Sequence, residues 1–126
     1  MLSRSPLEQS LVPEPARQGF VDMQRRVEDI RRRFLDRLPD RYYQITTLCR
    51  ALDSGQGGAE AIDGIAERAH KIAGVADTLG YPELGARSAV ADRSLSEMRT
   101  ARDWENARPA VRALVDEIAR TIRQSG

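Results

Sequence analysis

The chain has one histidine, His70, and the next residue, Lys71, is its only lysine. An imidazole can act as a nucleophile or move a proton near neutral pH, so His70 is the first candidate for chemistry. On a helix, the residues one and two turns away from His70 are either small or acidic. These neighbours are Asp63, Ala66, Glu67, Ala73, Gly74 and Asp77.

The small neighbours predict an open patch around the imidazole ring. Gly74 is informative because a glycine inside a helix costs about 1 kcal/mol relative to alanine. A helix keeps such a glycine incidentally, or because another molecule must come close. An acid among Asp63, Glu67 and Asp77 could accept a hydrogen bond from one ring nitrogen and leave the other as the nucleophile. Most single surface histidines carry no chemistry, and spacing alone leaves that alternative open.

Other types of site find little support in the composition. One cysteine, Cys49, and one histidine cannot form a zinc cluster, and the sequence has no Gly-rich phosphate loop. The formal net charge is +1, which gives no overall field for nucleic acid or membranes. The arginine triplet at 31–33 points in three directions on a helix, so we expect a solvated face and no nucleic-acid binding. Without a signal peptide or an apolar run long enough to span a membrane, we expect a cytoplasmic protein.

Five segments repeat apolar residues at alternating spacings of about three and four, which is typical of amphipathic helices. The first covers roughly residues 17–38 and has Phe20, Met23, Val27, Ile30 and Phe34. The other four have Ile45, Leu48 and Leu52; Ile62, Ile65, Ala69, Ile72, Ala76 and Leu79; Leu84, Ser88, Ala91, Leu95 and Met98; and Ala107, Val111, Leu114, Ile118 and Ile122.

Proline, glycine and aspartate predict where these helices begin and end. Pro39 predicts a kink or a new helix start, and "DSGQGG" at 53–58 predicts a loop. Gly80 is a candidate C-terminal cap, and Asp103 is a candidate N-terminal cap for the last helix. With no strand signal, the prediction is an all-α fold: an antiparallel up-and-down four-helix bundle with an additional N-terminal helix packing across it or extending it. Residues 1–16, which contain three prolines, are expected to be a flexible leader, followed by one domain at 17–126.

The stretch "AHKIAGVADTLGYPELGARSAVAD", residues 69–92, resembles the signature of histidine-containing phosphotransfer (HPt) domains, the helical bundles of multistep two-component phosphorelays. The family pattern has a phosphorylated histidine, a glycine four residues later, a Leu-Gly pair, a leucine and a later acidic residue. Here these positions are His70, Gly74, Leu79 with Gly80, Leu84 and Asp92. The segment "FLDRLPDRYYQITTLCRALDSG" at 34–55 is similar to the family's segment before the active helix.

One position departs from the commonest family pattern, His-x-x-Lys-Gly. This sequence has Ala73 there, as in a His-x-x-Ala-Gly variant, and its only lysine is Lys71. Lys71 points about 100° away from His70 on a helix, but its long stem could curl toward a phosphoryl oxygen. A direct role for Lys71 and a merely solvated lysine both stay open, whereas for Glu67 a surface charge is the favoured interpretation.

The resemblance implies a phosphocarrier and not a kinase. His70 would attack the aspartyl phosphate of a response-regulator receiver domain and later pass the phosphoryl group to another receiver; a hybrid histidine kinase is a further candidate partner. No cofactor is expected on this chain, because the divalent metal would be held by the receiver. We expect a monomer, with Ala66, Ala73, Gly74 and Asp77 supporting the site or the docking of the partner.

Two alternatives remain from the sequence. The phosphoacceptor and dimerisation bundle of a histidine kinase also carries a histidine on a helix, although 126 residues leave no room for an ATP-binding domain. A non-catalytic helical interaction module is the second alternative.

Overall fold

The computed structural model describes residues 14–98 and 101–125, and this part of the chain is helical throughout apart from its turns. The elements are α2 (Glu14–Asp53), α3 (Gly58–Val75), α4 (Pro82–Ser96), the 3-10 helix η1 (Ala101–Asp103) and α5 (Trp104–Ser125). The prediction of an all-α fold is therefore confirmed. The chain divides into two compact units, 1–33 and 34–126.

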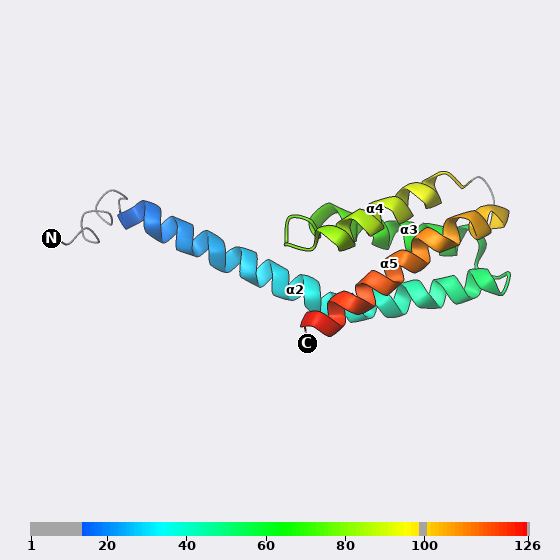
Figure 1. Cartoon of the computed structure of the whole chain (residues 1–126), viewed down its shortest axis with the longest axis horizontal. Helices are drawn as coiled ribbons and strands as arrows, with labels where there is room; N and C mark the ends of the chain where they lie inside the picture. The colour runs from blue at the N-terminus through cyan, green and yellow to red at the C-terminus, as the bar shows by residue number, and fades with distance from the viewer. Residues whose placement is uncertain (1–13, 99–100, 126) are drawn as a thin grey trace. The chain divides into compact units, whose positions relative to one another are not determined.

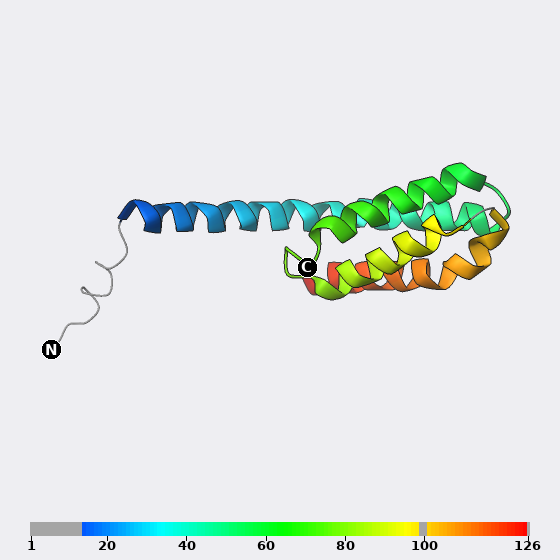
Figure 2. The ribbon, with the colours of Figure 1, turned by 90° about the horizontal axis from the view of Figure 1, so that it is seen from above.

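Within the unit 34–126, the last part of α2 and the helices α3, α4 and α5 run alternately up and down (Figures 1 and 2). Each helix turns the face predicted from its apolar spacing toward a common core. The largest fully buried apolar side chains of that core are Leu38, Ile45, Ile65, Ile72, Leu84, Val111, Leu114 and Ile118. Burying a side chain of this size contributes about 1.5–3 kcal/mol, so these positions dominate the stability of the bundle.

Of the two outcomes predicted at Pro39, a new helix start is wrong, because α2 continues through this residue as one helix. A proline inside a helix removes one backbone hydrogen bond and costs about 3 kcal/mol. On either side of it, however, Leu38 and Ile45 are fully buried in the same core. Tertiary packing thus outweighs the local preference, and the expected first and second helices form one helix.

The first unit contributes only the beginning of α2 to the described residues. Of the leader expected at 1–16, residues 1–13 lie outside the described part, and α2 already begins at Glu14. The predicted helix in this region is present, but Phe20, Met23, Val27 and Ile30 are exposed.

The two expected turns on either side of α3 are present. Between α2 and α3, Gly55, Gly57 and Gly58 have positive φ angles of 82°, 87° and 50°, which glycine adopts at little cost. After α3, the chain continues through a turn to Gly80, whose φ is 97°. The predicted cap at Gly80 is wrong, because α3 ends at Val75 and its C-cap residue is Ala76; Gly80 instead ends the following turn in the left-handed conformation.

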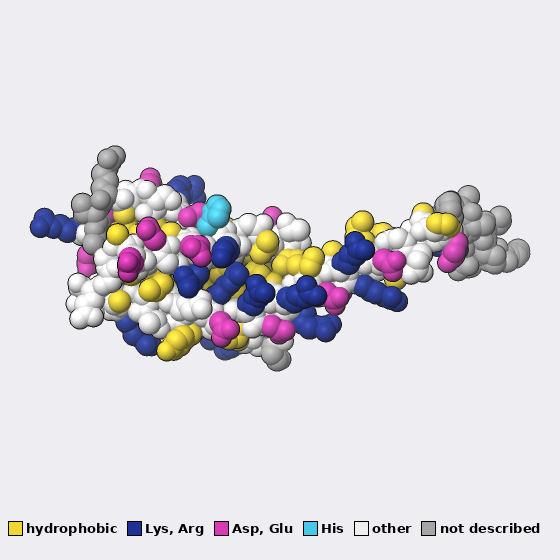
Figure 3. All heavy atoms as spheres, turned by 180° about the vertical axis from the view of Figure 1, so that it is seen from behind, with side chains coloured by type: hydrophobic (Ala, Val, Ile, Leu, Met, Phe, Trp, Pro, Cys, Tyr) yellow, Lys and Arg dark blue, Asp and Glu magenta, His cyan; other side chains and the backbone are white. Residues whose placement is uncertain are grey.

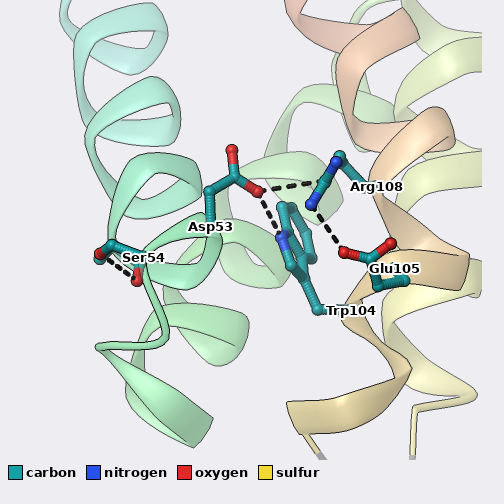
Figure 4. A network of polar contacts seen from close by, with 6 residues as sticks. Asp53, Ser54, Trp104, Glu105 and Arg108 are labelled. Carbon is teal, nitrogen blue, oxygen red and sulfur yellow. Dashed lines mark hydrogen bonds and ion pairs between the residues drawn. The ribbon is translucent and has the colours of Figure 1, made fainter.

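A polar network joins the end of α2 to the start of α5 (Figure 4). The indole Nε1 of the buried Trp104 donates a hydrogen bond to Oδ1 of Asp53 at 2.8 Å. The same carboxylate oxygen lies 3.1 Å from Nε of Arg108, and that guanidinium also donates to Glu105 at 2.9 Å. We call Asp53, Trp104 and Arg108 the Trp104 corner. It links the end of α2 to the start of α5, which are about fifty residues apart in sequence.

Candidate functional site

His70 lies on α3, on a side of the helix that faces solvent and not the core. Ala69, directly before His70, and Ile72, two residues after it, are fully buried and anchor α3 in the core. The side chain of His70, in contrast, is 78% exposed. Figure 3 shows the imidazole of this sole histidine standing on the molecular surface. The helix therefore holds the ring at a fixed place while leaving it accessible to another protein.

The imidazole is oriented by an acid from the neighbouring helix. Nδ1 of His70 lies 3.0 Å from Oδ2 of Asp92 on α4. An ionised carboxylate can only accept a hydrogen bond, so Nδ1 carries the proton and donates it to Asp92. In the neutral ring, Nε2 then keeps its lone pair and is available as a nucleophile. The contact selects the tautomer as well as the orientation.

An open hollow lies beside the ring between α3 and α4. From α3 it is lined by His70, Ala73 and Gly74, and from α4 by Ala89, Asp92 and Arg93. A Cβ atom added to Gly74 would meet no other atom within 4 Å, so packing inside this chain does not require a glycine there. The hollow is wide and shallow, which suits the approach of a protein surface better than the enclosure of a small molecule.

The remaining predicted site residues, Ala66, Glu67, Lys71 and Asp77, do not line this hollow. Lys71 forms an ion pair with Glu67 at 3.3 Å, so these two charges contact each other and neither is seen to contact the imidazole. Ala66 is half-buried and packs against the core. Asp77 is exposed and lies in the turn after α3. The acid that contacts the ring is Asp92, and not one of the acids on α3 considered from the sequence.

Two residues of the site could not be found from helical spacing. Asp92 is 22 positions away from His70 and Arg93 is 23, so only the packing of α4 on α3 brings them there. For Asp92 the sequence held one signal, its match to the acidic position of the HPt pattern. For Arg93 we find no signal in the sequence.

A positive cluster lies on α2 and α3, within the unit 34–126. Burial, followed by the charges of Arg37 and Arg68, lowers the pKa of Arg41 from its usual value. Arg68 is held in place by hydrogen bonds to the Gln44 side chain at 2.8 Å and to the Gly64 carbonyl at 2.8 Å. This part of the surface therefore favours contact with anionic groups.

Among residues 14–98 and 101–125, no three His, Cys, Asp or Glu side chains gather where they could hold a metal ion. In the same part of the chain, no helix is both long and apolar enough to cross a membrane.

Comparison with protein families agrees with this geometry. The family model described as "Hpt domain" matches residues 29–121, which include α3, α4 and most of α5. Searches of curated proteins and of solved structures found no match to this chain. The chain belongs to the Hpt domain family, the helical histidine phosphotransfer modules of two-component phosphorelays, which carry phosphoryl groups without a kinase activity of their own.

Proposed function

We propose that His70 accepts a phosphoryl group from the aspartyl phosphate of a receiver domain and passes it, reversibly, to the aspartate of another receiver. The observation that carries this proposal is the exposed imidazole, hydrogen-bonded through Nδ1 to Asp92 and bordered by Ala73 and Gly74. A nucleophile that must reach a phosphorus atom on another protein needs both a fixed orientation and open space.

The proposed transfer balances on these atoms. The Nε2 lone pair of His70 attacks the phosphorus in line, the N–P bond forms, and the bond between phosphorus and the aspartyl oxygen breaks. The departing electrons stay on the aspartate, which leaves as a carboxylate. The imidazole becomes positively charged during the attack, and Asp92 stabilises this charge through the Nδ1 proton. The reverse sequence returns the phosphoryl group to a second receiver.

Phosphoryl oxygens on Nε2 need positive partners, and this chain has no lysine at the Ala73 position. Arg93 lines the same hollow as His70, so we assign to it the main contact with the phosphoryl group from this chain. Lys71 is a second source of charge. Its pair with Glu67 is exposed on both sides, and such pairs are worth only about 0–1 kcal/mol, so Lys71 can leave Glu67 for a phosphoryl oxygen at little cost.

The receiver would supply the divalent metal and the remaining positive charge of the transition state. Under this proposal the chain works without a cofactor and as a monomer. Gly74 and Ala73 form the floor of the docking surface beside His70, while Ala66 helps to anchor α3 and Asp77 lies at the border of that surface.

The test is transfer of labelled phosphate from phosphorylated receiver domains to this protein. We expect label that is lost in acid and kept in base, as for phosphohistidine. His70→Gln should stay folded and accept no label, whereas Cys49→Ser, which removes the only thiol, should accept label normally. Label that survives in His70→Gln would reject the assignment. If no receiver from the same organism labels the wild-type protein, the non-catalytic interaction module becomes the better explanation.

A further inference from the structure

A narrow apolar stripe on the first part of α2 has no role in the phosphotransfer site. Its members are Phe20, Met23, Val27 and Ile30, and they are exposed by 61%, 63%, 36% and 50%. All four belong to the compact unit 1–33. Large apolar side chains on one face of an exposed helix mark an interaction surface. We call these four residues the α2 stripe.

The spacing of the α2 stripe indicates what kind of surface covers it. The steps of three, four and three residues correspond to the a and d positions of a heptad repeat. Apart from Val21, which is 38% exposed at a b position, the exposed large apolar residues of this segment lie at a and d positions. Such a seam is narrower than the broad apolar face by which a helix lies on a membrane or a globular core. Asp22, Glu28 and Asp29 interrupt the arginines of the polar side, so this side is less uniformly basic than that of a helix lying on an anionic membrane. The stripe therefore fits another helix better than a lipid surface.

Charges beside the α2 stripe indicate which helix fits. With Phe20 and Val27 at a positions, the flanking e and g positions are Arg17, Gly19, Gln24, Arg26, Arg31 and Arg33. None of these six is acidic, and four are arginines. Side chains at e and g positions face those of the partner helix and decide which partner is accepted.

A second copy of this chain is a poor partner for the α2 stripe. In a parallel pair, Arg26 of one helix would face Arg31 of the other, and an antiparallel pair would again bring arginines together. Like charges in this position oppose pairing.

We propose that the α2 stripe binds an amphipathic helix of a partner protein, with apolar residues at heptad spacing and Asp or Glu beside them. Arg31 already pairs with Glu28 at 2.6 Å, and Arg17 pairs with Glu14. These pairs are on the helix surface and weak, so carboxylates of a partner can share or replace them. The interaction is separate from phosphorylation, and it would hold a partner through α2 while His70 reacts.

Two designed peptides of about three heptads, with identical Ile and Leu seams, test this proposal. One has Glu at its e and g positions and the other has Lys. Each is titrated against the full chain at low salt, with binding followed by fluorescence anisotropy. We expect the acidic peptide to bind at least about tenfold more tightly than the basic peptide, and Met23→Gln with Ile30→Gln to abolish the binding.

A charge reversal supplies the matched control. Arg26→Glu with Arg33→Glu, both at g positions, should reverse the preference toward the basic peptide. Arg25→Glu with Arg32→Glu changes the net charge equally, but at f positions away from the seam, and should keep the preference for the acidic peptide. Three results would each overturn the proposal. The first is equal binding of both peptides, and the second is self-association of the wild-type chain through the α2 stripe in sedimentation experiments. The third is stripe-dependent binding to vesicles of anionic phospholipid.

Discussion

The chain has one thiol and one imidazole, and these two side chains differ in their burial and in the effect of a nearby acid. Cys49 is half-buried on α2 beside the Trp104 corner, where burial, and then the charge of Asp53, raises the pKa of the thiol to about 11. His70 is exposed on α3, and its acidic neighbour Asp92 orients the ring. An acid beside the thiol makes the reactive thiolate rarer, whereas the acid beside the imidazole contacts Nδ1 and not Nε2, the nitrogen proposed to react.

This difference shows that residue type alone does not identify a reactive group. Both side chains are capable of nucleophilic chemistry, and both lie on helices of the same bundle. The Cys49 thiol is half-buried, whereas the His70 ring is exposed and contacts Asp92 through Nδ1. The region between α3 and α4 leaves His70 accessible at an open hollow, while the region between α2 and α5 holds the contacts of the Trp104 corner. The following predictions, in order of decreasing effect, test this contrast.

The largest effect is expected at the Trp104 corner. Trp104 is 4% exposed, so Trp104→Ala removes a large buried ring and the hydrogen bond to Asp53. We expect a loss of about 3–5 kcal/mol in the free energy of unfolding, measured by urea denaturation. The remaining folded protein should still transfer phosphate at His70. A loss below about 1 kcal/mol would show that the corner does not stabilise the bundle.

The next effect is expected at Asp92 and concerns the rate. Asp92→Ala should slow transfer to His70 by about ten- to a hundredfold, because the ring loses its orientation and its preferred tautomer. The melting temperature should hardly change, since an exposed contact of this kind is worth about 0–1 kcal/mol. Asp92→Asn can still accept the Nδ1 hydrogen bond but carries no charge, so its transfer rate should lie between those of the wild-type protein and Asp92→Ala. Normal transfer rates in Asp92→Ala would contradict the role of this contact.

A smaller effect is expected for the thiol of Cys49. With a pKa of about 11, its thiolate is rare at pH 8 and becomes common only as the pH rises toward that value. Because thiols of high pKa are also more nucleophilic as thiolates, the net reaction with iodoacetamide should be about tenfold slower than for an unfolded control peptide. The rate should keep rising with pH up to about 11. A rate that levels off near pH ~8.5, which is the ordinary pKa of a thiol, would mean that the Cys49 thiol is not shielded.

The smallest effect on stability is expected at Gly74. Gly74→Gln should raise the free energy of unfolding by up to roughly 0.5 kcal/mol through helix propensity, because the added side chain meets open space. Transfer should nevertheless slow by about tenfold, since the glutamine would stand in the hollow beside His70.

Gly19→Gln is the matched control for this change, because Gly19 is also helical and open but lies outside the hollow. It should leave transfer unchanged. Equal transfer rates in the Gly74 and Gly19 variants would show that the hollow is not the docking surface.

Much of the fold could be predicted because the apolar spacing of each helix reports one buried face. The residues Val111, Leu114 and Ile118 were expected on one stripe and are all fully buried. The same spacing in the α2 stripe predicted a helix correctly but could not tell what covers it, since a pattern is the same for a core and for a partner. A new helix start at Pro39 was wrongly expected, because burial on both sides of this residue outweighs its local cost.

The candidate site was predictable only in part, for a similar reason. His70 and Gly74 are four residues apart on one helix, and spacing alone placed them together. Asp92 and Arg93 reach the site through the packing of α4 against α3, which short-range spacing does not encode.

The most direct test of this account is to determine which nitrogen of His70 carries the phosphoryl group. The protein, labelled with 15N in its one histidine, is phosphorylated by a receiver domain and measured by NMR for coupling between phosphorus and the ring nitrogens. Because Asp92 holds Nδ1, the account predicts coupling to Nε2 alone. Coupling to Nδ1, or phosphate on a residue other than His70, would contradict it.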